Sequence, residues 1–140
     1  MKEKIIWTQE YSVNVAEFDE QHKEFINICN GLIELTEKEE FTKEEALSGV
    51  MKLGDYASYH LGSEEALFTK INYPDAAMHV EIHDQFREKA KGFIEKIRDE
   101  NVDIAKTLKE VAEFSISWFL SHILEVDKKY SDYFNKHGIS

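Results

Sequence analysis

The chain has few residues that break helices, link segments covalently or bind polyanions. Its 140 residues include one proline, six glycines and one cysteine. A single cysteine excludes an internal disulfide, and the shortage of proline and glycine favours long helices. With 17 lysines and arginines against 28 acidic residues, the formal net charge is -11. That charge argues against binding to nucleic acid or to an anionic membrane, because both partners need a basic surface.

Long hydrophobic runs are also missing. No stretch approaches the roughly 18 apolar residues of a membrane-spanning helix, and the opening MKEKIIWTQEYS has no apolar run long enough for a signal peptide. We therefore expect a cytoplasmic protein. Apolar residues still make up 42% of the chain, enough for a single domain over residues 1–140 with a core of its own. Cys29, among the apolar neighbours of FINICNGL, is expected to be a buried core thiol.

Four segments carry apolar residues at the helical period. The first is expected to run from about Asp19 to Glu37, with Asp19 as its N-cap. The second begins at Thr42, which forms a capping-box pattern with Glu45, and ends near NYPD. The third follows NYPD, and the fourth follows RDENVD and carries apolar residues as far as Phe134.

No segment of any length alternates as a β-strand does. Because the connections between the expected helices are short, consecutive helices should lie antiparallel. The sequence thus predicts an all-α fold, an antiparallel up-down-up-down four-helix bundle over residues 18–135. Residues 1–17 should form an N-terminal arm, whose apolar anchors are Trp7, Tyr11, Val13 and Val15.

Histidines fall on or beside the apolar faces of these helices. His79 and His83 are four residues apart in AMHVEIHDQF, so a helix brings them to one face. His60 and Glu64 have the same spacing on the second helix, and His22 is in register with the apolar stripe of the first.

The fourth helix supplies His122 and Asp127, which are five residues apart. A helix turns by about 140° over that step, so the two can reach one centre only through a wide approach or a local bulge. The sequence does not choose between these. His137 lies in the polar tail NKHGIS and is expected to stand outside any site.

Each of these features has a simpler explanation when taken alone. A lone helical histidine such as His22 is more often satisfied by its neighbours than by a metal, and His60 with Glu64 could be an ion pair on a helix face. The order His-x-Glu-x-His excludes the His-Glu-x-x-His motif of zinc proteases. Convergence favours a metal centre, because burying five imidazoles and two carboxylates without partners would cost several kcal/mol each.

Seven donors are too many for one ion, so two metal ions are expected to share them. Imidazole and carboxylate donors suit iron, zinc or manganese better than calcium. The lack of a cysteine donor argues against structural zinc. Ferritin-like di-iron bundles use Glu-x-x-His on two helices, and only Asp19-x-x-His22 approaches that pattern.

Three stretches together resemble the hemerythrin family, in particular its bacterial type: W…YSVNVAEFDEQH, HLGSEEALFTKINYPDAAMHVEIHDQF and WFLSHILEVDKKY. The resemblance runs from Trp7 to about Phe134, and its combined spacing is highly specific. It departs at Leu61, where many relatives have phenylalanine, which bears on local packing alone.

The resemblance implies a non-haem centre of two iron ions joined by a bridging oxo or hydroxo group. The ligands that it implies are His79, His83 and His122 for one iron, His22 and His60 for the other, and Glu64 and Asp127 as bridges. Counting these donors against two six-coordinate ions leaves one open position, on the iron with two histidines.

The implied function is reversible dioxygen binding, for oxygen storage, delivery or sensing, and not enzymatic. Two alternatives stay open: a di-iron redox enzyme that consumes peroxide or nitric oxide, and an iron-handling or sensor module that reports to a partner. No flavin or nicotinamide motif supplies electrons for the enzyme. The expected partners are dioxygen and an unidentified protein recipient, with the chain a monomer or weak homo-oligomer.

An apolar wall should keep water away from the open position. Helical register with the histidines gives five candidates, each more simply a core residue: Trp118, Phe25, Ile26, Leu61 and Ile123. Trp7 could cover the site from the arm or only pack nearby.

Overall fold

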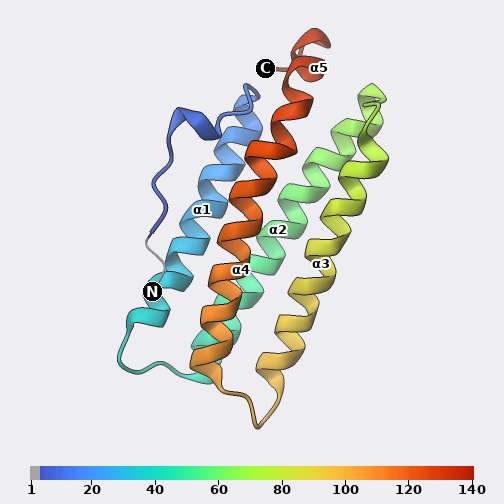
Figure 1. Cartoon of the computed structure of the whole chain (residues 1–140). Helices are drawn as coiled ribbons and strands as arrows, with labels where there is room; N and C mark the ends of the chain where they lie inside the picture. Colours follow the sequence, from blue (N-terminus) through green and yellow to red (C-terminus); the bar gives the residue numbers. More distant parts are fainter. Residues whose placement is uncertain (1–3) are drawn as a thin grey trace.

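Four long helices lie side by side and make up most of the molecule. The computed structural model describes residues 4–140, and within that range the regular elements are all helical. The long helices are α1 (Ala16–Glu37), α2 (Lys43–Ile71), α3 (Ala76–Arg98) and α4 (Ile104–Glu125). Consecutive helices run in opposite directions, α1 and α3 downward and α2 and α4 upward in Figure 1. The predicted all-α, up-down-up-down four-helix bundle is confirmed.

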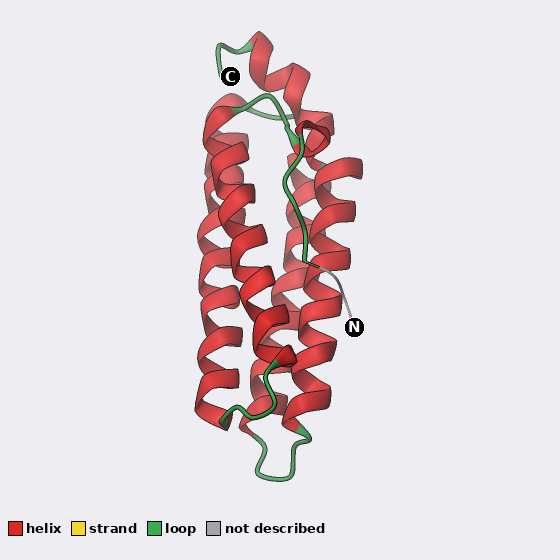
Figure 2. Cartoon of the chain, turned by 90° about the vertical axis from the view of Figure 1, so that its left-hand side faces the viewer, coloured by secondary structure: helices red, strands yellow, loops and turns green. Residues whose placement is uncertain are grey.

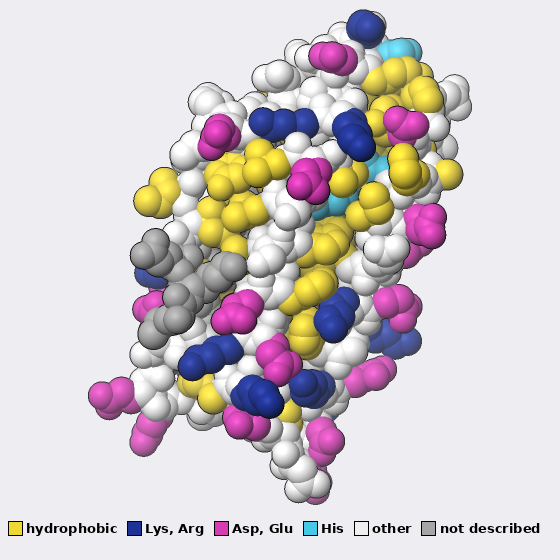
Figure 3. Space-filling model, viewed as in Figure 1, with side chains coloured by type: hydrophobic (Ala, Val, Ile, Leu, Met, Phe, Trp, Pro, Cys, Tyr) yellow, Lys and Arg dark blue, Asp and Glu magenta, His cyan; other side chains and the backbone are white. Residues whose placement is uncertain are grey.

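The core is formed by the apolar stripes that the sequence predicts. Each helix buries residues three or four positions apart, and the stripes meet along the axis of the bundle. Cys29 is fully buried among them, as expected. Over residues 4–140, none of the helices is long and apolar enough to cross a membrane. On the face shown in Figure 3, lysine and arginine side chains lie scattered among acidic ones.

The N-terminal arm lies along the outside of the bundle (Figure 2). Residues 1–3 of the predicted arm lie outside the described range. Ile5 pairs with the side chain of Asn30 on α1 through two hydrogen bonds of 2.8 and 2.9 Å. A single turn, η1 (Gln9–Tyr11), follows before the chain enters α1.

The predicted N-cap of α1 is wrong. The helix begins at Ala16, and Asp19 already lies in its first turn. The Asp19 carboxylate instead accepts hydrogen bonds from the Ser12 hydroxyl at 2.6 Å and from the Val13 backbone N–H at 2.8 Å. Asp19 therefore ties the arm to the helix rather than starting the helix. The capping box of α2 is confirmed, because Thr42 and Glu45 exchange both of its hydrogen bonds.

The fourth helix ends earlier than its apolar pattern predicts. It stops at Glu125, and the chain continues through a tight turn, η2 (Asp127–Tyr130), into the short α5 (Ser131–Lys136). In Figure 1, α5 extends beyond the upper end of the bundle. Tyr130 and Phe134, at the end of the apolar pattern, are buried as predicted, but the change of helix type at Val126 re-aims the side chain that follows.

Candidate metal centre

All seven predicted donors meet in the upper half of the bundle. Each is at most 3% exposed, and all four long helices contribute. His137, expected to stand apart, is exposed, and its ring donates a hydrogen bond to the Tyr133 carbonyl. The donors that converge are His22 from α1, His60 and Glu64 from α2, His79 and His83 from α3, His122 from α4, and Asp127 from η2.

The donors form two groups that share both carboxylates. One consists of His79, His83 and His122 with Glu64 and Asp127, and its candidate ligand atoms lie within 4.8 Å of one another. The other group, held to the same limit, consists of His22 and His60 with the same two carboxylates.

Within each group, imidazole nitrogens face one another at short range. The Nε2 atoms of His22 and His60 are 3.0 Å apart. Nε2 of His122 lies 3.1 Å from Nε2 of both His79 and His83. Two nitrogens that each lie about 2.1 Å from one ion are roughly 3.0–3.4 Å apart, depending on the angle between them. The observed spacing therefore fits nitrogens that could share an ion.

Each carboxylate turns one oxygen toward each histidine group. Asp127 places Oδ2 at 3.2 Å from Nε2 of His22, and Oδ1 at 2.9 and 3.0 Å from Nε2 of His122 and His79. The chain leaves the α-helical path before η2, and this change lets the Asp127 side chain reach the same centre as His122, five residues earlier.

Glu64 repeats this arrangement on the facing helix. Its Oε2 lies 3.7 Å from His60, and its Oε1 lies 3.2 Å from His83. The Tyr130 hydroxyl donates a 2.5 Å hydrogen bond to Oε2, and burial raises the pKa of Tyr130 well above its ordinary value, so the phenol keeps that proton.

Several buried atoms of the centre have no hydrogen bond. They are Nδ1 of His22 and His122, Oε1 of Glu64 and both oxygens of Asp127. The Asp127 oxygens lie close to imidazole nitrogens but lack hydrogen-bond geometry. Buried polar atoms in that state are costly, and cations between the two groups would satisfy the three oxygens. The residues present fit metal ions.

The protonation of three donors, Asp127, Glu64 and His60, suits metal binding as well. Burial alone would raise the pKa of Asp127, but the surrounding imidazoles, His122 foremost, hold it well below its ordinary value. For Glu64, burial and the charge of Asp127 act upward and the histidines outweigh them, so its pKa is lowered too. Burial lowers the pKa of His60 to about 4. Both carboxylates are thus ionised and His60 is neutral at pH 7, the forms that bind metals.

Two polar residues that the sequence analysis did not identify form hydrogen bonds with histidine rings, each at Nδ1, the nitrogen that faces away from the centre. The amide oxygen of Gln21 lies 2.6 Å from Nδ1 of His60, and Oε2 of Glu65 lies 2.7 Å from Nδ1 of His83. Both oxygens accept, so Nδ1 carries the proton and Nε2 is free to bind an ion. The only sequence signal was position, since Gln21 precedes His22 and Glu65 follows Glu64.

Aromatic side chains enclose the two-histidine group. Phe119 packs edge-on against His22 with ring centroids 5.4 Å apart, and stacks on Phe25 at 4.0 Å. Phe18 meets His60 at 6.1 Å. The predicted wall residues that the structure buries are Phe25, Ile26, Leu61 and Ile123. Phe119 and Phe18, which also contact these histidines, were not among the predicted wall residues.

The two tryptophans lie in different places. Trp118 is half-buried and stacks on His122 at 4.4 Å, so it covers the three-histidine group rather than the two-histidine group. Trp7 packs against Tyr11 and below the Lys23 ammonium, on the arm side of α1.

Comparisons with known proteins agree with this arrangement. A family model described as the Hemerythrin HHE cation binding domain matches residues 13–134. A bacteriohemerythrin of Clostridium acetobutylicum is 28% identical over 129 residues, which cover 91% of this chain and 98% of that protein. A myohemerythrin of Theromyzon tessulatum is 27% identical over 124 residues, which cover 89% and 88%. A crystal structure of wild-type hemerythrin, 27% identical, superposes with a TM-score of 0.80 over 91% of this chain and 95% of that one.

Proposed function

The chain belongs to the hemerythrin family, and from that premise we propose that it binds dioxygen reversibly at a non-haem centre of two iron ions. The observation that carries the proposal is the direction of the two carboxylates. Glu64 and Asp127 each turn one oxygen toward each histidine group, as bridging ligands of two neighbouring ions must.

The two proposed irons would have unequal numbers of protein ligands. This difference would leave a coordination position for dioxygen on one of them. The proposed ligands are His79, His83 and His122 for one iron, His22 and His60 for the other, and Glu64 and Asp127 for both, with an oxo or hydroxo bridge. The ion with two histidines has one protein donor fewer and is the one that can offer a position. When bound, the irons supply electrons that dioxygen takes up on binding and returns on release.

The chain's own residues keep that position dry. Phe119 packs against His22 and His60, and Phe25 stacks on Phe119. Phe18 packs against His60, and Phe18 and Phe25 are each 1% exposed. Water and its protons would favour loss of reduced oxygen species from the site. An apolar enclosure therefore favours release of dioxygen unchanged, which storage, delivery and sensing all require.

The test is an anaerobic one. The purified protein is loaded with iron(II), the iron per chain is counted, and visible spectra are recorded through cycles of dioxygen addition and removal. We expect two irons per chain and charge-transfer bands that appear with dioxygen and vanish without it. His60→Ala should lose iron or dioxygen binding, whereas the matched control His137→Ala, at the exposed histidine, should behave as the parent.

Two outcomes would contradict the proposal, the first its function and the second its ligand set. One is a centre that oxidises once, releases hydrogen peroxide and does not return, which would indicate a redox enzyme or an iron-handling protein. The other is unchanged iron and dioxygen binding in His60→Ala, which would mean that the ligand set is wrong.

A further inference from the structure

Glu65 lies directly behind a proposed ligand without being one itself. Its Oε2 is 2.7 Å from Nδ1 of His83, the ring nitrogen opposite the one that faces the centre. We infer that Glu65 is a positioning residue that makes the centre easier to oxidise and thereby strengthens dioxygen binding. This inference rests on the proposed function.

The hydrogen bond fixes both the orientation and the basicity of His83. Because a carboxylate only accepts, the His83 proton stays on Nδ1 and Nε2 keeps its lone pair for the centre. Nε2 lies 3.2 Å from Oε1 of Glu64, well inside the donor group. An anionic partner on Nδ1–H makes the imidazole a stronger donor, and a stronger donor favours the more highly charged, oxidised ion.

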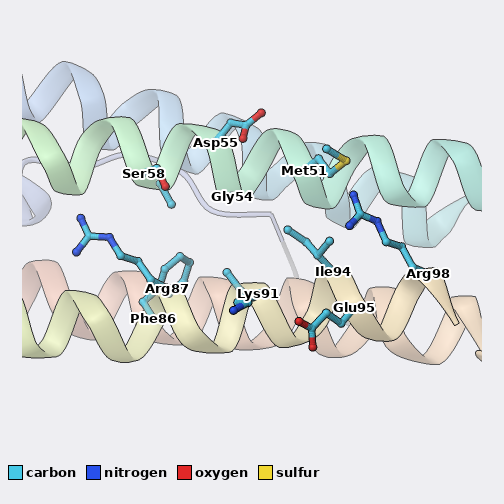
Figure 4. A pocket seen from close by; sticks show the side chains of 12 residues that line it. Met51, Gly54, Asp55, Ser58, Phe86, Arg87, Lys91, Ile94, Glu95 and Arg98 are labelled. Atoms are coloured by element: carbon cyan, nitrogen blue, oxygen red, sulfur yellow. The ribbon is translucent and has the colours of Figure 1, made fainter.

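Arg87 holds Glu65 in this position. Its guanidinium forms a fork with the carboxylate, with Nη1–Oε2 at 2.8 Å and Nη2–Oε1 at 3.0 Å. Arg87 follows His83 by one helical turn, so α3 presents both groups to Glu65 on α2. Arg87 also bonds Asp84 at 2.9 Å and lines a groove of about 390 Å³ between α2 and α3 (Figure 4).

The same device occurs on the other side of the centre with a neutral partner. His60 is held through Nδ1 by the amide oxygen of Gln21 at 2.6 Å. The two hydrogen bonds differ in length by only 0.1 Å, but only Glu65 is a carboxylate. The three-histidine group is therefore backed by an anion and the two-histidine group by a neutral amide, and this asymmetry is what the experiment addresses.

The decisive variant is Glu65→Gln, which keeps an acceptor for Nδ1 but removes the charge. We expect two irons per chain, an upward shift of the reduction potential in an anaerobic spectroelectrochemical titration, and a roughly tenfold higher dioxygen concentration at half-saturation. Asp84→Asn is the matched control, because it removes a carboxylate that binds Arg87 but forms no hydrogen bond with the His83 ring. It should leave the reduction potential and the half-saturating dioxygen concentration unchanged.

Two further variants separate charge from position. Glu65→Leu removes the acceptor altogether and should also weaken iron binding by about 10–100-fold, measured by competition with a chelator. Gln21→Glu places a charge behind His60 and should shift the potential downward. Far-UV circular dichroism verifies that each variant is folded.

An unchanged potential in Glu65→Gln, or an equal shift in Asp84→Asn, would overturn the inference, because Glu65 would then act only as an ion-pair partner. The potential is measured without dioxygen. A parent protein that binds two irons but no dioxygen would contradict the proposed function, while the shift in Glu65→Gln would still decide whether Glu65 tunes the centre.

Discussion

The two halves of the bundle bury opposite chemistry on the same four helices. The upper half holds the starts of α1 and α3 and the ends of α2 and α4, which lie at the top in Figure 1. Its buried side chains include five histidines and two carboxylates. The lower half is built from side chains such as Leu32, Leu53, Ile97 and Leu108. Among residues 4–140, its buried polar side chains are Thr107, in the first turn of α4, and Ser115, near the middle of that helix, and neither carries a charge.

The difference shows that one hydrophobic pattern can support two sources of stability. Each large apolar side chain of the lower half contributes about 1.5–3 kcal/mol by leaving water, with no ligand needed. The upper half places unpaired atoms such as both Asp127 oxygens in the interior, which opposes folding unless cations bind there. We therefore expect the halves to respond differently to the same treatments.

Removal of iron should have the largest effect and should act on the upper half. A ligand at about 1,000 times its dissociation constant stabilises the fold by about 4 kcal/mol, and each kcal/mol changes the Tm of a chain of this size by about 2–4 °C. We expect the metal-free protein to melt about 8–16 °C lower. Hydrogen exchange should accelerate in residues 16–26, 57–71, 76–86 and 116–130.

Residues 29–37, 43–54, 90–98 and 104–112 serve as the internal reference. Their exchange should change little, because their burial does not depend on the metal. Uniform acceleration along all four helices would mean that the two halves unfold as a single cooperative unit.

The reverse perturbation is Leu108→Ala in the lower half. Leu108 is 0% exposed, and removing its side chain leaves a cavity that should cost about 2–5 kcal/mol of unfolding free energy, measured by urea denaturation. The variant should still bind two irons per chain. A loss of iron would show that the lower half controls the geometry of the centre.

The sequence predicts the bundle because its apolar period and the positions of its helix ends indicate the same four helices. The apolar period, the capping box of Thr42 and Glu45, and the short connections all indicate antiparallel helices. The error at Asp19 has a physical reason: an acidic residue near a helix start suits the N-cap and also the first turn, and local sequence does not show that Ser12 and Val13 fold back to it.

For the centre, residue spacing in the sequence identifies the donors. It does not show how they are oriented or which residues form hydrogen bonds with their rings. Four-residue steps place His60 with Glu64 and His79 with His83 on common faces. Asp127 is correctly chosen, but its orientation depends on the end of α4 at Glu125, where neither proline nor glycine marks the change. The residues behind the rings, Gln21 and Glu65, are polar and sit beside stronger signals, and only contacts between helices reveal them.

Acid should weaken the metal-free fold through the upper half. The pKa of His60 falls from an ordinary 6.5 to about 4, because of burial first and despite the charge of Glu64. Below pH 6.5, His60 therefore binds a proton in the unfolded chain but stays neutral in the folded chain. Its contribution to the free energy of unfolding is fully present above pH 6.5 and is lost as the pH falls toward 4. Between pH 6.5 and 5 the loss should be about 1.5 kcal/mol.

Urea denaturation of the metal-free protein at several pH values measures this slope. His83 has a raised pKa despite its burial, through its carboxylate neighbours Glu64 and Glu65, so its contribution changes above pH 6.5 and stays outside the window. His60→Leu should flatten the slope, and an equally steep slope in that variant would assign the effect to another group.

The smallest expected effect is also the one that should be equal in both halves. Gly62 in the upper half and Gly92 in the lower half both lie within helices, and a Cβ added at either meets nothing within 4 Å. Alanine at each should stabilise the iron-loaded protein by about 0.5–1 kcal/mol through backbone entropy alone. At Gly49 an added Cβ would lie 2.9 Å from Cδ2 of the buried Leu32, so Gly49→Ala should give no gain. Equal gains at Gly62 and Gly92 in urea denaturation would show that the halves differ only in what they bury, whereas a gain confined to Gly92 would show that the helices around the centre are themselves strained.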